Sequence, residues 1–279
     1  MRYLALCKPR LAGLAAVASA AGCLVAAPGR PAAAAWAAAG VFILAAGAAA
    51  LNHYQDRDLD RRMDRTKGRP IPSGLVRPGP ALAFSILLLG AGLAVLGRGG
   101  ARPVILGALA AAWYNGVYTP LKKKSPMAAV PGALSGALAP VVGGAFGGAR
   151  WDDPRLIILA LALFIWQIPH FWLVVLDRGR EFREAGAPSL LDLLSEGQAR
   201  RVVAHWVLGT AAASLVIAGW GAFGSPAARW AVLAISLWLA ARALWFRASP
   251  VRRERALFRT MNLHMAALLL VIGLDRLLR

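Results

Sequence analysis

Cysteine and acidic residues are both scarce in this chain of 279 residues. The two cysteines, Cys7 and Cys23, are too few and too isolated for a disulfide framework or a cysteine metal site. Aspartate and glutamate number 13 against 32 lysines and arginines, which gives a net charge of +19. Such a charge often indicates nucleic-acid binding, but here the basic residues alternate with long apolar runs. We therefore predict no nucleic-acid partner.

Hydrophobic residues make up 58% of the chain and gather in runs long enough to cross a lipid bilayer as helices. The sequence predicts an all-α polytopic membrane protein, with nine transmembrane helices in one bundle around a central cavity. We expect one domain over residues 1–279. The predicted spans are residues 11–27, 33–51, 80–97, 103–118, 127–147, 156–176, 202–222, 228–246 and 256–274.

The basic residues outside these spans predict the topology. Most of them lie in the N-terminal segment and in every second connection, a bias typical of the cytoplasmic side. We therefore expect a multi-pass protein of the cell inner (cytoplasmic) membrane, with a cytoplasmic N-terminus and the C-terminus on the opposite side. Cytoplasmic lid loops are expected at about residues 52–79 and 177–201. Lys8 and Arg10 are expected to anchor the first helix at phosphate headgroups.

An acidic stripe begins where the second predicted span ends. Asn52, Asp56, Asp60 and Asp64 recur at every fourth residue, so all four can share one face of a helix. Neighbouring carboxylates at this spacing repel one another, which favours a bound cation among them. Oxygen ligands suit Mg²⁺, which is typically held by one or two carboxylates together with phosphate oxygens of a substrate.

A simple charged surface is the alternative explanation of this stretch, because several arginines accompany the acids. Asp58 and Arg62 have the favourable i,i+4 spacing of a surface ion pair. Acid clusters at a membrane interface are nevertheless functional candidates by default.

A second acidic cluster follows the sixth predicted span. Asp177 and Glu181 lie four residues apart and are interleaved with arginines, among them Arg180. Both clusters follow even-numbered spans, so both should lie on the same face of the membrane. We predict that Asn52, Asp56 and Asp60 bind one Mg²⁺ and that Asp177 and Glu181 bind a second.

Four motifs resemble those of one enzyme family. The NxxxDxxxD stripe continues into MxRTxxRP, which comprises Met63, Arg65, Thr66, Arg69 and Pro70. With LCKPRL (residues 6–11), YTPLKKKSP (residues 118–126) and WQIPHFW (residues 166–172), the chain resembles the UbiA-type intramembrane prenyltransferases. Within them it is most similar to the protoheme IX farnesyltransferases, also called haem O synthases. The resemblance covers most of residues 1–190.

The resemblance implies transfer of a farnesyl group from farnesyl diphosphate to the vinyl group of haem B, forming haem O, with Mg²⁺ assisting ionisation of the diphosphate. It implies catalytic roles for Asn52, Asp56 and Asp60, and association with other haem-modifying or oxidase-assembly proteins. The expected substrate-binding residues are Arg65, Arg69, Tyr118, Lys122, Lys123, Trp166, His170 and Arg180.

Several alternatives stay open at this stage. His170 can ligate haem iron, bind a propionate or pair with Gln167 inside the bundle. Each lysine from Lys122 to Lys124 can bind diphosphate or serve only as a topology signal. The acceptor can also be a quinone precursor such as 4-hydroxybenzoate, and a transporter with paired acidic clusters is a less favoured function. The last third of the chain carries no comparable motif.

Overall fold

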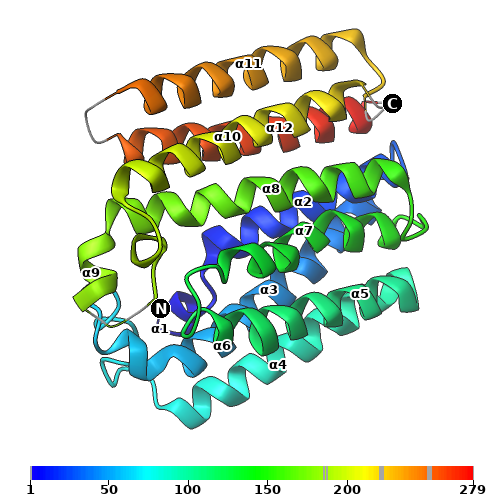
Figure 1. Ribbon diagram of the computed structural model, residues 1–279. Helices are drawn as coiled ribbons and strands as arrows, with labels where there is room; N and C mark the ends of the chain where they lie inside the picture. Colours follow the sequence, from blue (N-terminus) through cyan, green and yellow to red (C-terminus); the bar gives the residue numbers. More distant parts are fainter. Residues whose placement is uncertain (1, 185, 187, 220–222, 250–252, 279) are drawn as a thin grey trace.

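The computed structural model describes residues 2–184, 186, 188–219, 223–249 and 253–278, apart from the side chains of residues 180, 182 and 183. Every regular element in this part of the chain is helical (Figure 1). The elements are α1 (Arg2–Leu6), α2 (Pro9–Ala26), α3 (Pro31–Asp60), α4 (Pro78–Leu96), η1 (Gly97–Gly99), α5 (Ala101–Ala112), η2 (Trp113–Tyr118), α6 (Thr119–Leu121), α7 (Ala129–Phe146), α8 (Pro154–Asp177), α9 (Gly179–Glu184), η3 (Leu190–Asp192), α10 (Glu196–Gly219), α11 (Pro226–Ala248) and α12 (Glu254–Leu277).

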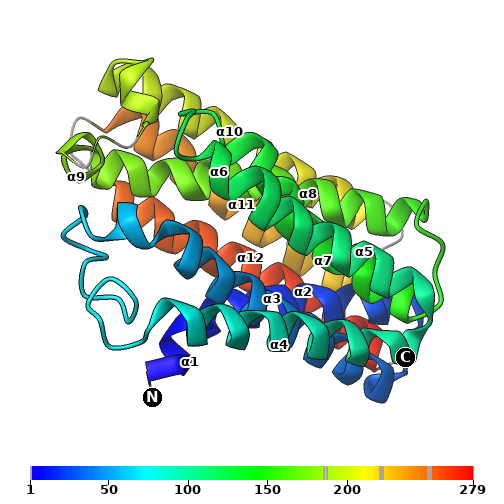
Figure 2. The ribbon, with the colours of Figure 1, turned by 90° about the horizontal axis from the view of Figure 1, so that it is seen from below.

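Nine helical segments in the described residues account for the predicted crossings. Eight are long and apolar enough to cross a membrane. The ninth is interrupted: α5 has only 12 residues, but the chain stays helical through η2 and α6. The two termini lie at opposite ends of the bundle in both views, as an odd number of crossings requires (Figures 1 and 2). The predicted fold class is thus confirmed, while the central cavity stays a prediction.

Two predicted loop boundaries are wrong, because helices extend into both. The acidic stretch continues α3 as far as Asp60, so the first loop begins at Arg61 rather than at residue 52. The second predicted loop contains α9 and η3, and α10 already begins at Glu196. Ser195 and Gln198 form a reciprocal cap there: the Ser195 N–H donates to Gln198 Oε1 (2.9 Å), and the Gln198 N–H donates to Ser195 Oγ (3.3 Å). The last three residues of the predicted span 202–222 lie outside the described residues.

Small residues allow close packing of the helices around α7. A methyl group added at Gly22 of α2 would lie 2.0 Å from the Pro140 carbonyl oxygen, and one at Gly143 of α7 would lie 1.8 Å from the Ser19 carbonyl oxygen. Gly132 and Gly136 are covered by the side chains of Tyr118 and Gln167. The glycines of α7 therefore allow its neighbours to pack closely against it.

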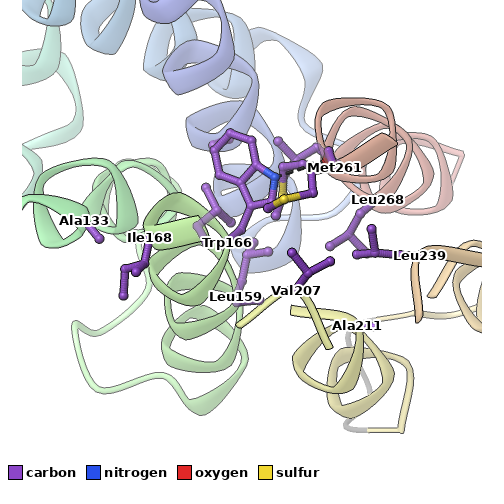
Figure 3. Packing of buried hydrophobic residues seen from close by; sticks show 14 of the residues in the cluster. Ala133, Leu159, Trp166, Ile168, Val207, Ala211, Leu239, Met261 and Leu268 are labelled. Carbon is purple, nitrogen blue, oxygen red and sulfur yellow. Dashed lines mark hydrogen bonds between the residues drawn. The ribbon is translucent and has the colours of Figure 1, made fainter. Parts of the chain in front are cut away.

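The main hydrophobic core lies among α8, α10, α11 and α12, where Leu159, Val207, Leu239 and Leu268 are buried (Figure 3). One end of the bundle is rich in charged residues, and we call it the polar end. In Figure 1 the loop after α3, α9 and the N-terminus gather at one end of the bundle, and α6 lies nearby. This end carries the residues predicted to be functional.

Candidate functional site

The first three residues of the acidic stripe lie on α3 and are almost completely buried. Asn52 is 1% exposed, Asp56 is 3% exposed and Asp60 is 4% exposed. The Asn52 amide donates to Asp56 Oδ2 (2.9 Å) and to Thr119 Oγ1 (3.0 Å). The predicted helical face therefore exists for these three residues, and it points into the protein.

Each of the three residues is paired with a cationic side chain. Lys8 Nζ donates to Asn52 Oδ1 at 2.8 Å, and Lys122 Nζ pairs with Asp56 Oδ2. Arg69 donates to both carboxylate oxygens of Asp60, at 2.8 and 2.7 Å. These pairs come from three separate segments: the N-terminus, the loop after α3 and the loop after α6. The cations contact every candidate ligand oxygen on these three residues except Asp56 Oδ1.

Asp64, the fourth member of the predicted stripe, does not belong to this face. The helix ends at Asp60, and the Asp64 side chain is 81% exposed and pairs with Lys67 at 2.7 Å. Asp58 forms the exposed pairs, with Arg57 at 3.8 Å and Arg61 at 3.6 Å, rather than the predicted pair with Arg62. The stretch is therefore both a charged surface and a buried acidic face, on different sides of one helix.

Lys8 was expected at lipid headgroups, but its ammonium group lies at the acidic face. Its backbone has φ 44° and ψ 63°, and it is the one non-glycine residue with positive φ in the described part of the chain. A left-handed backbone costs a lysine about 1–2 kcal/mol. In this conformation Lys8 is the N-cap of α2, and its side chain reaches Asn52. No feature of the sequence predicts the positive φ, although the place of Lys8 in the LCKPRL motif indicated that this residue could be functional.

A π-helical segment, η2, adds polar partners that the sequence analysis missed. The Asn115 amide donates to the Ala48 carbonyl (3.0 Å) and to Gln55 Oε1 (3.1 Å), while Gln55 Nε2 donates to the Asn115 carbonyl (3.0 Å). Thr119 Oγ1 accepts from Asn52 and donates to the Tyr114 carbonyl (2.9 Å). π-Helical turns often mark functional sites, and this one fastens α3 to the segment carrying Lys122. Asn115 and Thr119 are polar residues at the end of an apolar run, and this was the sequence feature that could have identified them.

The lysines after α6 are not equivalent. Lys122 pairs with Asp56, and Lys123 donates to the Gln55 carbonyl (2.6 Å) and lies 3.5 Å from Asp56 Oδ1. Lys124 is exposed. The Tyr118 ring lies 5.5 Å from both the Lys122 ammonium and the Tyr114 ring. Tyr118 therefore covers one side of the Lys122 side chain.

The second acidic cluster lies at the same end of the bundle as the first. Glu181 Oε1 accepts from the backbone N–H of Arg65 at 2.8 Å, which joins α9 to the loop after α3. Asp177 instead pairs with Arg255 of α12, at 2.9 and 3.0 Å. Glu181 thus contacts the loop that follows the first cluster, whereas Asp177 faces α12. The side chain of Arg180 lies outside the described part of the structure.

The local charges favour an anionic ligand. Burial, followed by the charges of Lys122 and Arg69, lowers the pKa of Lys8 to about 7. Burial also lowers the pKa of Lys122, although Asp56 opposes this shift. Burial and Arg69 lower the pKa of Arg65. Several cations therefore gather around two buried carboxylates, and an anion bound among them would relieve their repulsion.

The donor atoms on α3 fit a hard cation. Asn52, Asp56 and Asp60 offer only oxygen, and the buried Asp56 Oδ1 has no hydrogen-bond partner in the described structure. No group of three or more histidine, cysteine, aspartate or glutamate side chains suited to a metal occurs in the described residues. Two carboxylates and an amide nevertheless suffice for Mg²⁺ when phosphate oxygens and water complete its coordination.

His170 and Trp166 lie deeper, on α8. The Trp166 indole donates to the Met261 carbonyl at 3.1 Å, and its ring lies in the core beside Met261 (Figure 3). The His170 ring lies 4.7 Å from the Trp166 ring and 4.6 Å from the Phe258 ring, tilted against both. Gln167 donates to the Ala133 and Leu163 carbonyls, so the suggested Gln167–His170 pair is not formed. The Nδ1 atom of His170 is buried and has no hydrogen-bond partner among the described residues.

Comparison with known proteins adds independent information. A model of the UbiA prenyltransferase family matches residues 15–266. The protoheme IX farnesyltransferase of Geobacter sulfurreducens is 43% identical over 266 residues, which cover 93% of each chain. That of Oleidesulfovibrio alaskensis is 33% identical and covers 96% of this chain and 94% of its own.

Solved structures show the same fold. A structure of digeranylgeranylglyceryl phosphate synthase covers 100% of this chain and 98% of its own, with a TM-score of 0.78 and 17% identity. A UbiA homologue from Archaeoglobus fulgidus, bound to GPP and Mg²⁺, covers 98% of this chain and 99% of its own, with a TM-score of 0.68 and 19% identity.

Proposed function

Because the chain belongs to the UbiA prenyltransferase family, and its relatives place it among the protoheme IX farnesyltransferases, we propose that it transfers a farnesyl group from farnesyl diphosphate to a vinyl group of haem B, forming haem O. The relatives are named for this activity and cover nearly the whole chain. The identity of the acceptor, haem B, and the length of the prenyl chain are proposed from the names of those relatives. The reaction type, prenyl transfer, is supported by the geometry of the site as well.

The buried acidic face of α3, with a cation on each ligand, is the observation that carries the proposal. An isolated buried carboxylate is costly, and here Lys122 and Arg69 balance the charges of Asp56 and Asp60 while Lys8 bonds to Asn52. Magnesium diphosphate carries both a cation and an anion. Its Mg²⁺ would bind the oxygen atoms of Asn52, Asp56 and Asp60, and its phosphate oxygens would bind the side chains of Lys8, Lys122 and Arg69.

The chain's own residues perform most of the proposed chemistry. Lys8, Lys122 and Arg69 hold the phosphates and stabilise the negative charge that develops as the C1–oxygen bond breaks. Bound Mg²⁺ supplies Lewis acidity toward the leaving diphosphate. The apolar helices hold the farnesyl tail and exclude water until the allylic cation has reacted with the vinyl carbon. Water then adds to the resulting cation and loses one proton, which gives the hydroxyethylfarnesyl group.

A second magnesium site at Asp177 and Glu181 is part of the proposal. Glu181 already contacts the backbone of the loop that carries Arg65 and Arg69, so it is close to the first site. Asp177 would first have to leave Arg255. Arg65 lies beside both clusters and is proposed to bind the outer phosphate.

The protein is an integral membrane protein, and we propose that the polar end of the bundle faces the cytoplasm. The basic residues that gather at this end support that orientation. The proposed location is the cell inner membrane, with the C-terminus on the opposite side. Association with haem-modifying or oxidase-assembly proteins is a further prediction from the family.

Product analysis tests the proposed function. Purified protein is incubated with farnesyl diphosphate and Mg²⁺, together with either haem B or 4-hydroxybenzoate, and the products are identified by mass spectrometry. We expect a product with the mass of haem O, no prenylated benzoate, and no product with Asp60→Asn. A prenylated benzoate without haem O would contradict the assigned acceptor. Transport of a substrate into liposomes without any covalent product would contradict the enzyme class.

A further inference from the structure

His53 is a buried residue of the site whose polar atoms are unused. Its side chain lies on α3 and the residue is 3% exposed. Both ring nitrogens are buried, and neither has a hydrogen-bond partner in the described structure. Burying unpaired polar atoms is unfavourable unless a ligand or water satisfies them. Two unused nitrogens on one ring therefore indicate a missing partner.

The position of His53 on α3 relates this ring to the acidic face. His53 precedes Asp56 by three residues and Asp60 by seven, so it lies about 60° from the first and about 20° from the second around the helix axis. It lies about 4.5 Å below Asp56 along that axis, on the side toward the bundle interior. His53 therefore belongs to the same face, beside Asn52 along the axis and almost one turn farther from the polar end than Asp56.

The surrounding charges support this placement. The charges of Lys8, Arg69 and Lys122 all act on the His53 ring. These are the cations that pair with Asn52, Asp60 and Asp56. The ring is thus within electrostatic reach of all three segments that enclose the site.

His264 provides an internal comparison, because it is a buried histidine with a structural role. It is 0% exposed, its Nε2 lies 3.0 Å from Ser214 Oγ, and its Nδ1 lies 3.2 Å from the Ile235 carbonyl oxygen. Both of its nitrogens are used within the scaffold. Helix packing in this protein can therefore satisfy a buried histidine, yet it does not satisfy His53.

We propose that His53 is a further substrate-binding residue, which donates a ring N–H to an oxygen of the phosphate that carries the prenyl chain. A histidine ring offers at least one N–H donor in either protonation state. Lys122 and Arg69 pair with Asp56 and Asp60, which lie nearer the polar end than His53, and the prenyl chain extends into the apolar bundle. His53 lies between these two regions. This inference rests on the proposed function, since it assumes that a prenyl diphosphate binds here.

The test compares two leucine variants, His53→Leu and His264→Leu, with wild-type protein in detergent. Thermal unfolding is measured without ligand, and binding of inorganic pyrophosphate and of farnesyl S-thiolodiphosphate is measured by calorimetry with Mg²⁺ present. His53→Leu removes unsatisfied atoms, so its unfolding temperature should equal or exceed that of the wild type. Its affinity for both ligands should fall by about tenfold or more, as expected for the loss of a hydrogen bond to a charged group.

The controls separate binding from folding. His264→Leu should unfold at a lower temperature and bind pyrophosphate normally, while His53→Gln should retain most of the affinity because its amide also donates. Unchanged binding by His53→Leu would overturn the inference and leave the proposed function intact. A loss of ligand-free stability in His53→Leu as large as that in His264→Leu would also overturn it. Wild-type protein that binds neither ligand would overturn the proposed function as well.

Discussion

Replacement of Lys122 by methionine should change the affinities for magnesium and for diphosphate in opposite directions. The Lys122 ammonium pairs with Asp56 in a setting where the two side chains are 19% and 4% exposed. Magnesium must displace this ammonium to reach Asp56, whereas diphosphate is expected to bind it. Methionine removes the competitor of the metal and a partner of the phosphates at once.

The magnitude follows from the strength of one hydrogen bond between charged groups, about 1.5–3 kcal/mol. We therefore expect Mg²⁺ alone to bind Lys122→Met about 10- to 100-fold more tightly than wild type, and pyrophosphate to bind more weakly by a similar factor. The variant also leaves the Asp56 carboxylate with a weaker cation, Lys123 at 3.5 Å, so its ligand-free stability should fall.

Calorimetry and thermal unfolding in detergent check both changes. Without diphosphate, Mg²⁺ should raise the unfolding temperature of Lys122→Met more than that of wild type, because tighter binding to the native state stabilises it more. Lys124→Met is the matched control, since Lys124 lies two residues away and is exposed. Affinities for metal and diphosphate that fall together, or that do not change, would refute the competition.

Three further predictions concern other contacts of the site. Asp56→Asn and Asp60→Asn should each reduce prenyl transfer by at least about 100-fold in a product assay, and both variants should stay folded in the membrane. Near-native turnover in both variants would contradict the assignment of these residues as metal ligands. Lys8→Gly removes the backbone strain and the hydrogen bond to Asn52, which are of similar size, so the free energy of unfolding in denaturant titrations should change by less than about 1 kcal/mol while pyrophosphate binding weakens. Arg10→Met, an exposed neighbour, should change neither. Glu181→Ala should speed proteolysis of the loop after α3 several-fold, because the hydrogen bond from the Arg65 N–H is lost. Equal cleavage rates in the variant and the wild type would show that this hydrogen bond does not hold the loop in place.

The sequence predicted the fold class because bilayer crossing depends on length and apolarity, which are local properties. The predicted span 103–118 is the one that the structure interrupts, with a short α-helix followed by a π-helical segment. The boundaries near Asp60 and Glu196 were wrong for a different reason. The predictions placed the end of each apolar span at the first charged residues. A helix can continue past the apolar span, because its backbone hydrogen bonds and its side-chain contacts do not depend on the bilayer. A capping pair, Ser195 and Gln198, was present in the sequence at the second boundary.

By itself, the sequence determined the helical face of Asn52, Asp56 and Asp60, because the period of an α-helix fixes which neighbours share a side. It also determined that the two acidic clusters lie at one end of the bundle, through the number of spans between them. Only the tertiary structure decided that Lys8 reaches Asn52, that Lys122 rather than Lys124 reaches Asp56, and that His53 is buried without a partner. Those outcomes depend on contacts between segments 44 to 66 residues apart in the chain, whose relative positions are set by helix packing and by one strained backbone conformation.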